Sequence, residues 1–215
     1  MNKSLLRIII LGLYLILFLI PGFILIFFRD GWGFLTSGSA ELAAYTFVRL
    51  FGLYTFTLAF FQILIGAFFI DLGKIFGPKT VLLFHRIEGI FVLTLAFTHP
   101  FFYLLYNWLQ VKNLSILQNL VPNYIGSESE RLISFGLTAL YLLIVTVITA
   151  YFRNSPILIR NWRKIHYLNY LIFFLAFFHS FLLGTDTQTL PLKAFWVVYL
   201  GLGLVAFLYR RFLKA

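Results

Sequence analysis

The stretch VLLFHRIEGIFVLTLAFTHPFFYLLY, residues 81–106, decides how the chain is interpreted. A helix that crosses the apolar core of a bilayer needs about 20 predominantly apolar residues, and this stretch is long enough. It nevertheless carries two histidines, His85 and His99. Ionisable side chains at membrane depth are costly, and their default interpretation is functional. The stretch therefore predicts a membrane-spanning helix that uses its histidines.

The rest of the chain has the same character. Of its 215 residues 61% are hydrophobic and only 11% are charged, and the mean hydropathy is +0.95. A soluble domain of this size needs more charge to cover its surface, so we predict an all-α, polytopic membrane protein. One domain accounts for residues 1–215, and no internal repeat is evident. The apolar runs predict a six-helix bundle with spans at about 5–28, 44–70, 81–106, 131–152, 162–183 and 192–208.

The charge pattern predicts an orientation. Six spans place both termini on one side of the membrane, and twelve of the 17 basic residues fall on that side. By the positive-inside rule we expect both termini in the cytoplasm, in a prokaryotic plasma membrane. The net charge of +10 does not indicate nucleic acid, because the basic residues stand in short segments between apolar runs.

The four histidines all fall in two codirectional spans, with His85 and His99 in the third and His166 and His179 in the fifth. Separations of 14 and 13 residues correspond to about 21 and 20 Å of helix rise. Two haems, each ligated by one histidine from each helix, can therefore be stacked at two levels. Because the chain has no cysteine, thiolate ligands and covalent haem attachment through a C-x-x-C-H motif are excluded. We therefore expect two haem b groups, held noncovalently by histidine. The alternative is that some histidines are interfacial caps bonded to backbone or headgroups.

The unequal separations have a consequence for the fifth span. At about 100° per residue, 14 residues return a side chain to within about 40° of its starting direction, whereas 13 residues leave it about 140° away. We therefore expect the fifth span to twist locally, to carry a bulge, or to approach its two haems from different azimuths.

The segments HRIEGIFVLTLAFTHP (85–100) and WRKIHYLNYLIFFLAFFH (162–179) resemble the ferric reductase-like transmembrane domain. That domain is shared by ferric-chelate reductases, NADPH oxidases and the haem-binding membrane subunit of the periplasmic methionine-sulfoxide reductase system. The resemblance implies that His85 pairs with His166 at an inner haem and His99 with His179 at an outer haem. It also implies that Arg49, in TFVRLFG, meets the outer haem's propionates. The alternative for Arg49 is a snorkelling interfacial side chain.

Further candidates lie near His85 and His166, the first histidine of each span. Gly89, one turn after His85, lets a flat porphyrin approach the backbone, although ordinary small-residue helix packing explains it nearly as well. Arg86 either meets inner-haem propionates or simply sets topology. Glu88 is an intramembrane carboxylate that is expected to accept a hydrogen bond or to pair with Arg86 or another inner basic group. Asn169 is expected to bond within the inner pocket or between helices.

The chain also departs from its relatives. Many of them continue into FAD- and NADPH-binding domains, but no G-x-G-x-x-G fingerprint occurs here, so we expect FAD or FMN only through a separate partner. NADPH oxidases have a further histidine where this chain has Tyr103, which weakens a dedicated oxygen-reduction site. The methionine-sulfoxide reductase subunit usually lacks the histidine that stands here as His85. That difference favours the two-haem reductase branch.

These observations predict transmembrane electron transfer through two bis-histidine haems, by an oxidoreductase component with no catalytic residue of its own. The expected donor is a cytoplasmic flavoprotein or quinol, and the expected acceptor is an outer-face ferric chelate, dioxygen or protein. Membrane lipid is the remaining partner. Three alternatives stay open: a haem-binding anchor and electron-donor subunit of a periplasmic oxidoreductase such as a methionine-sulfoxide reductase system, a quinol-linked cytochrome b, and a transporter or assembly factor without haem.

Overall fold

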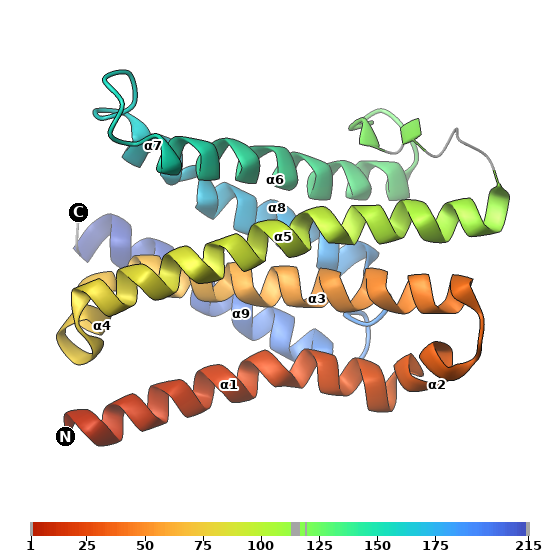
Figure 1. The fold of residues 1–215 in the computed structure, drawn as a ribbon, viewed down its shortest axis with the longest axis horizontal. Helices are drawn as coiled ribbons and strands as arrows, with labels where there is room; N and C mark the ends of the chain where they lie inside the picture. The colour runs from red at the N-terminus through yellow and green to blue at the C-terminus, as the bar shows by residue number, and fades with distance from the viewer. Residues whose placement is uncertain (1, 113–116, 119, 214–215) are drawn as a thin grey trace. The chain divides into compact units, whose positions relative to one another are not determined.

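The computed structural model describes residues 2–112, 117–118 and 120–213, and this part of the chain is helical without a β-strand (Figure 1). Six of its helical segments are long and apolar enough to cross a membrane. They are α1 (Lys3–Phe28), α3 (Ala40–Ala67), α5 (Pro78–Val111), α6 (Glu128–Tyr151), the successive helices α7 (Trp162–His166) and α8 (Leu168–Leu183), and α9 (Leu192–Leu208) with its π-helical end η2 (Tyr209–Leu213). Two short helices, α2 (Gly31–Thr36) and α4 (Phe69–Phe76), flank α3. The predicted all-α, multi-pass membrane fold is confirmed.

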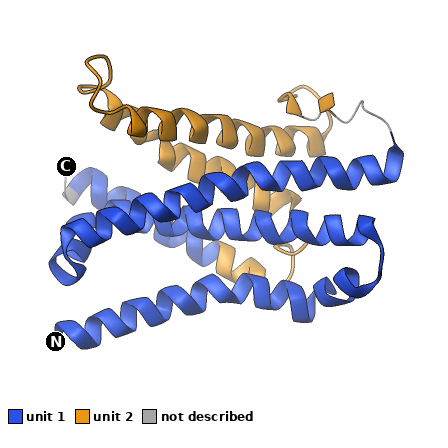
Figure 2. Cartoon of the chain, in the orientation of Figure 1, with its two compact units in different colours: residues 1–112, 197–215 blue, residues 113–196 orange. Residues whose placement is uncertain are grey.

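The chain divides into two compact units (Figure 2). Unit 1 comprises residues 1–112 and 197–215, and unit 2 comprises residues 113–196. Within unit 1, α3 packs along α5, and within unit 2, α6 packs along α8. Each unit therefore contains one of the two histidine-bearing spans and one partner helix. The expectation of a single domain over residues 1–215 stays a prediction.

Local sequence signals fix the helix starts, and some of them move the predicted boundaries. Ser39 caps α3 by accepting a hydrogen bond from the backbone N–H of Leu42 at 3.3 Å, so this helix begins at Ala40. Pro78 occupies the first turn of α5, where its missing N–H costs nothing. Ser127 and Glu130 form a capping box at the start of α6. The predicted link at 71–80 is largely helical, because α4 and the start of α5 occupy it.

A proline inside α1 shows how unit 1 is packed. Pro21 has no N–H, so the carbonyl of Leu17 lacks its usual intrahelical donor. The hydroxyl of Tyr199 on α9 donates to this carbonyl at 3.2 Å. The ring of Tyr199 also stacks on Phe60 of α3, with centroids 4.2 Å apart. In contrast, the other face of α1 exposes large apolar side chains such as Leu15, as expected for a helix in lipid.

The fifth span is interrupted between its two histidines. The helix breaks at Tyr167, directly after His166, and resumes at Leu168. The backbone N–H of Tyr170 donates to the Tyr167 carbonyl three residues earlier, which is the tighter 3₁₀ pattern. A 3₁₀ turn advances about 120° per residue instead of about 100°, so it adds rotation between His166 and His179. The fifth span thus contains a local twist, which is one of the three expected alternatives, and the other two stay predictions.

Candidate functional site

His99 on α5 is held by the backbone of α3 within unit 1. Its Nδ1 atom lies 2.9 Å from the carbonyl oxygen of Val48. The ring also packs against Gly52, where an added Cβ would lie 3.0 Å from Cε1 and 3.1 Å from Nδ1 of the imidazole. A contact that short forces the ring to move, so the position of His99 depends on a glycine at residue 52.

The spacing of four residues between Val48 and Gly52 has a geometric cause. In an α-helix each Cα–Cβ bond tilts toward the N-terminus, so the side chain of residue i+4 overhangs the turn that contains the carbonyl of residue i. A glycine at i+4 leaves that carbonyl uncovered. A carbonyl oxygen has two lone pairs, so it can accept from the helix and from a second donor at once. Gly52 thus exposes the Val48 carbonyl to the imidazole.

The same arrangement recurs in unit 2. The Nδ1 atom of His179 on α8 lies 2.8 Å from the carbonyl oxygen of Leu132 on α6. Four residues on, an added Cβ at Gly136 would lie 2.8 Å from Nδ1 and 2.9 Å from both Cε1 and Cγ of the same ring. We call each set, Val48–Gly52–His99 and Leu132–Gly136–His179, a carbonyl–glycine cradle.

The cradles fix the chemistry of the two rings. A carbonyl only accepts hydrogen bonds, so the nitrogen that faces it carries the proton, and Nδ1–H donates in both His99 and His179. The lone pair of the neutral imidazole is then on Nε2, which is the atom available to a metal. Histidines that ligate metals typically donate their other ring N–H to a carbonyl or carboxylate in this way. Both residues therefore fit axial ligation of a haem iron through Nε2.

The first histidine of unit 1 has a different environment. Near His85 on α5, the amide of Gln62 on α3 donates to the His85 carbonyl oxygen at 3.1 Å and to Oε2 of Glu88 at 2.5 Å. The hydroxyl of Tyr14 on α1 donates to the other oxygen of Glu88 at 2.7 Å. Glu88 is only 3% exposed, so this carboxyl group is a buried junction of three helices.

The first histidine of unit 2 contacts a side chain rather than the backbone. The Nδ1 atom of His166 lies 3.2 Å from the amide nitrogen of Asn169. The amide oxygen of Asn169 in turn lies 3.1 Å from the hydroxyl of Thr146 on α6. Asn169 is expected to bond within the inner pocket or between helices, and its contact with Thr146 does join two helices.

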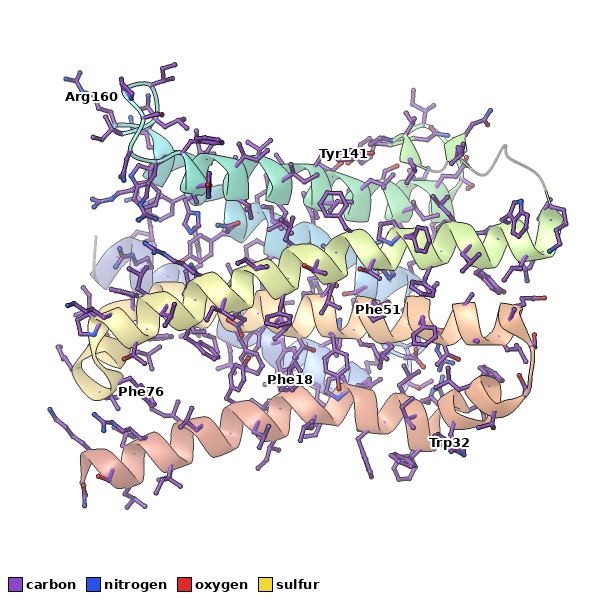
Figure 3. All side chains as sticks on the ribbon, in the orientation of Figure 1. Phe18, Trp32, Phe51, Phe76, Tyr141 and Arg160 are labelled. Atoms are coloured by element: carbon purple, nitrogen blue, oxygen red, sulfur yellow. The ribbon has the colours of Figure 1, made fainter. Side chains whose placement is uncertain are left out.

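These contacts reveal a repeat that the sequence analysis did not detect. In the partner helix, Val48 and Gln62 are 14 residues apart, and so are Leu132 and Thr146. In the histidine-bearing span, the polar partner stands three residues after the first histidine, as Glu88 in one unit and Asn169 in the other. The tripeptide Phe-Gly-Leu surrounds both cradle glycines, at 51–53 and 135–137. Both helix pairs therefore share one arrangement, although few of the corresponding residues are identical (Figure 3 shows Phe51 on α3).

Three further predicted residues, Arg49, Arg86 and Gly89, lie in unit 1. The guanidinium of Arg49 donates to the backbone carbonyl of Arg29 at 2.9 Å and lies 5.2 Å from the centroid of the Tyr45 ring. Arg86 is exposed. An added Cβ at Gly89 would meet no atom of its surroundings closer than Gln62 Oε1 at 3.6 Å, which is ordinary contact. The assignments of Arg49, Arg86 and Gly89 to haem binding stay predictions.

Within the described residues, no three or more histidine, aspartate or glutamate side chains gather as a metal-ion site. A haem iron would need at most two ligands from the protein, because the porphyrin nitrogens supply the other four. The ferric reductase-like transmembrane component family matches residues 50–177, which include His85, His99 and His166 and end two residues before His179. The chain belongs to this family. Domains of the family generally bind haem and are generally paired with redox partners. No curated protein and no solved structure matches the chain.

Proposed function

We propose that this chain carries electrons across a membrane through two noncovalently bound b-type haems. The observation that carries the proposal is the pair of carbonyl–glycine cradles, in a chain of the ferric reductase-like family. A haem b supplies a one-electron Fe(III)/Fe(II) couple when it is bound. The chain's own residues supply ligation, orientation and an apolar environment.

The histidines are proposed to act as axial ligands at two levels. His99 and His179 present Nε2, because their Nδ1–H groups donate to the Val48 and Leu132 carbonyls. Two histidine ligands fill both axial positions of an iron, which favours electron transfer over binding of an exogenous ligand. The pairing of His85 with His166 and of His99 with His179 rests on the family resemblance and on the helix spacing, since the two spans carry their histidines at near-equal separations of 14 and 13 residues.

The direction of electron flow and the partners complete the proposal. With the termini in the cytoplasm, His85 and His166 lie toward the cytoplasmic face, where a flavoprotein delivers electrons. His99 and His179 lie toward the outer face, where ferric chelate, dioxygen or a partner protein accepts them. Three exposed basic residues suit an acidic surface on the donor: Arg160 just before α7 (Figure 3), and Arg163 and Lys164 within it.

The deciding experiment is haem quantification on the full chain in nanodiscs, combined with reduced-minus-oxidised spectra. The expected stoichiometry is two haems per chain with a b-type α band. His99→Ala or His179→Ala removes one haem, and His85→Ala or His166→Ala removes the other. Thr98→Ala is a matched control, because the Thr98 hydroxyl bonds only to the Thr94 carbonyl of its own helix at 2.7 Å, and it retains both haems.

Four results would contradict parts of this proposal. A spectrum without the α band favours a transporter or assembly factor and refutes haem binding. Undiminished haem in all four alanine variants refutes the ligand assignment. If a quinol analogue reduces the haems while a flavin reductase with NADH does not, the chain is a quinol-linked cytochrome b. If the chain co-purifies with a periplasmic oxidoreductase, it is the anchor subunit of that enzyme.

A further inference from the structure

The first histidine of unit 2 is held differently from the second histidines. His99 and His179 donate to backbone carbonyls, but His166 faces the side chain of Asn169, three residues later in the same span. Asn169 is in turn fixed by Thr146 from α6. A chain of three polar groups, Thr146–Asn169–His166, therefore connects the partner helix to a proposed axial ligand.

The hydrogen count of Thr146 shows which way the Asn169 amide must point. Its hydroxyl oxygen lies 3.0 Å from the Leu143 carbonyl and 3.1 Å from the Asn169 amide oxygen. A hydroxyl has one hydrogen and can donate to only one of these two acceptors. The two ends of a side-chain amide have nearly the same shape, and their assignment follows from the hydrogen-bond network. A half-turn of the amide places its NH₂ group on Thr146 and its oxygen on His166.

The turned amide satisfies every group in the chain of contacts. Thr146 donates to the Leu143 carbonyl and accepts from Asn169 Nδ2, and Asn169 Oδ1 accepts from Nδ1–H of His166. This orientation is also the one that iron ligation requires, because a proton on Nδ1 leaves the lone pair on Nε2. Two independent requirements, the single hydrogen of Thr146 and the ligand tautomer of His166, select the same arrangement.

We infer that Asn169, oriented by Thr146, is the positioning residue for His166 and sets the ring orientation and basicity of that ligand. The inference rests on the proposed function, since it takes His166 to be an axial ligand. The internal repeat places Gln62 and Glu88 at the equivalent positions of unit 1. There the pair instead bonds to the His85 carbonyl and to Tyr14. Asn169 thus supplies a side-chain partner for His166, a proposed ligand of the first haem, which is the one assigned to His85 and His166.

The test uses Asn169→Leu, Asn169→Asp and Thr146→Val in the full chain, with haem content, midpoint potentials and low-spin electron paramagnetic resonance as readouts. Loss of an outer-shell partner typically weakens metal-site affinity about 10- to 100-fold. Asn169→Leu is therefore expected to weaken retention of the first haem by that factor. Thr146→Val is expected to keep the haem but shift its g-values, because these depend on the angle between the imidazole planes. Asn169→Asp, a stronger acceptor, is expected to retain the haem and lower its midpoint potential.

Thr149→Val is the matched control, because the Thr149 hydroxyl bonds to the Thr146 backbone carbonyl of its own helix at 3.1 Å. Retention of the second haem, which is the one proposed at His99 and His179, shows that a variant is folded. If Asn169→Leu and Thr146→Val match Thr149→Val in haem content, potential and g-values, the inference is wrong. His166→Ala separates the two proposals: retention of two haems in that variant overturns the proposed function, whereas loss of one haem with unchanged Asn169 variants overturns only the positioning role.

Discussion

Substitution of the cradle glycines gives the sharpest prediction. In Gly136→Ala the new Cβ would lie 2.8 Å from Nδ1 of His179, whereas ordinary van der Waals contact begins at 3.4 Å. The ring must therefore withdraw by about 0.6 Å, the difference between these distances. If it withdraws from α6, the 2.8 Å bond between Nδ1 and the Leu132 carbonyl lengthens to about 3.4 Å, outside the normal range of hydrogen bonds.

The same comparison predicts a graded series. Gly52→Ala requires a shift of only about 0.4 Å, since its closest contacts to His99 are 3.0 and 3.1 Å. Overpacking of this kind costs about 1–3 kcal/mol. We assign the upper part of that range to Gly136→Ala and the lower part to Gly52→Ala. At about 1.4 kcal/mol per tenfold change, haem binding at the second level weakens by about 100-fold and about 5-fold, respectively.

The assay is the rate at which haem transfers from nanodisc-embedded protein to excess apomyoglobin, with haem per chain measured in parallel. Gly66→Ala on α3 is the matched control, because nothing lies within 4 Å of its added Cβ. The expected order of haem loss is Gly136→Ala, then Gly52→Ala, then Gly66→Ala at the wild-type rate. Equal rates in all three variants, or the reverse order, would show that the glycines do not position the ligands.

Three further predictions concern other parts of unit 1. In Gly89→Ala the added Cβ would lie 3.6 Å from Gln62 Oε1, which is ordinary contact, so thermal stability is expected to be unchanged. If a porphyrin packs against Gly89, the same substitution reduces the content of the haem proposed at His85 and His166. Arg49→Gln removes a positive charge that would favour the reduced iron. Loss of a charge interaction of about 1–2 kcal/mol is expected to lower the midpoint potential of the second haem by tens of millivolts in a redox titration. Tyr199→Phe leaves the Leu17 carbonyl without its donor and is expected to cost about 1 kcal/mol of stability in detergent unfolding, with unchanged haem content.

The fold was largely predictable because lipid imposes a strong rule. Backbone groups must bond internally in a bilayer, so long apolar runs become helices, and the six spans follow from hydropathy alone. Helix ends were less predictable, since capping depends on single side chains. Ser39 moves the start of α3 four residues ahead of the predicted 44, and α4 converts a predicted link into helix.

The candidate site was predictable only in its most polar members. Four histidines in apolar helices stand out, whereas Gly52 and Gly136 carry no side chain and resemble ordinary packing glycines. What distinguishes these glycines is their position four residues after a carbonyl that accepts a hydrogen bond from a histidine. Each of these hydrogen bonds joins residues 47 or more positions apart in sequence. The shared Phe-Gly-Leu tripeptide is the one sequence signal that could have marked them.

The two cradles also explain why a backbone carbonyl is a suitable partner for a ligand in a membrane. A carboxylate at the same place would need hydrogen-bond donors of its own to offset the cost of its burial. Glu88, for example, accepts hydrogen bonds from Tyr14 and Gln62. A helix carbonyl is already desolvated and bonded, and its second lone pair is exposed by omitting one side chain. The cost is only the lower helix propensity of glycine, about 1 kcal/mol. A side-chain amide such as Asn169 requires a further partner, Thr146, to fix its direction, so it offers tuning where a carbonyl offers rigidity.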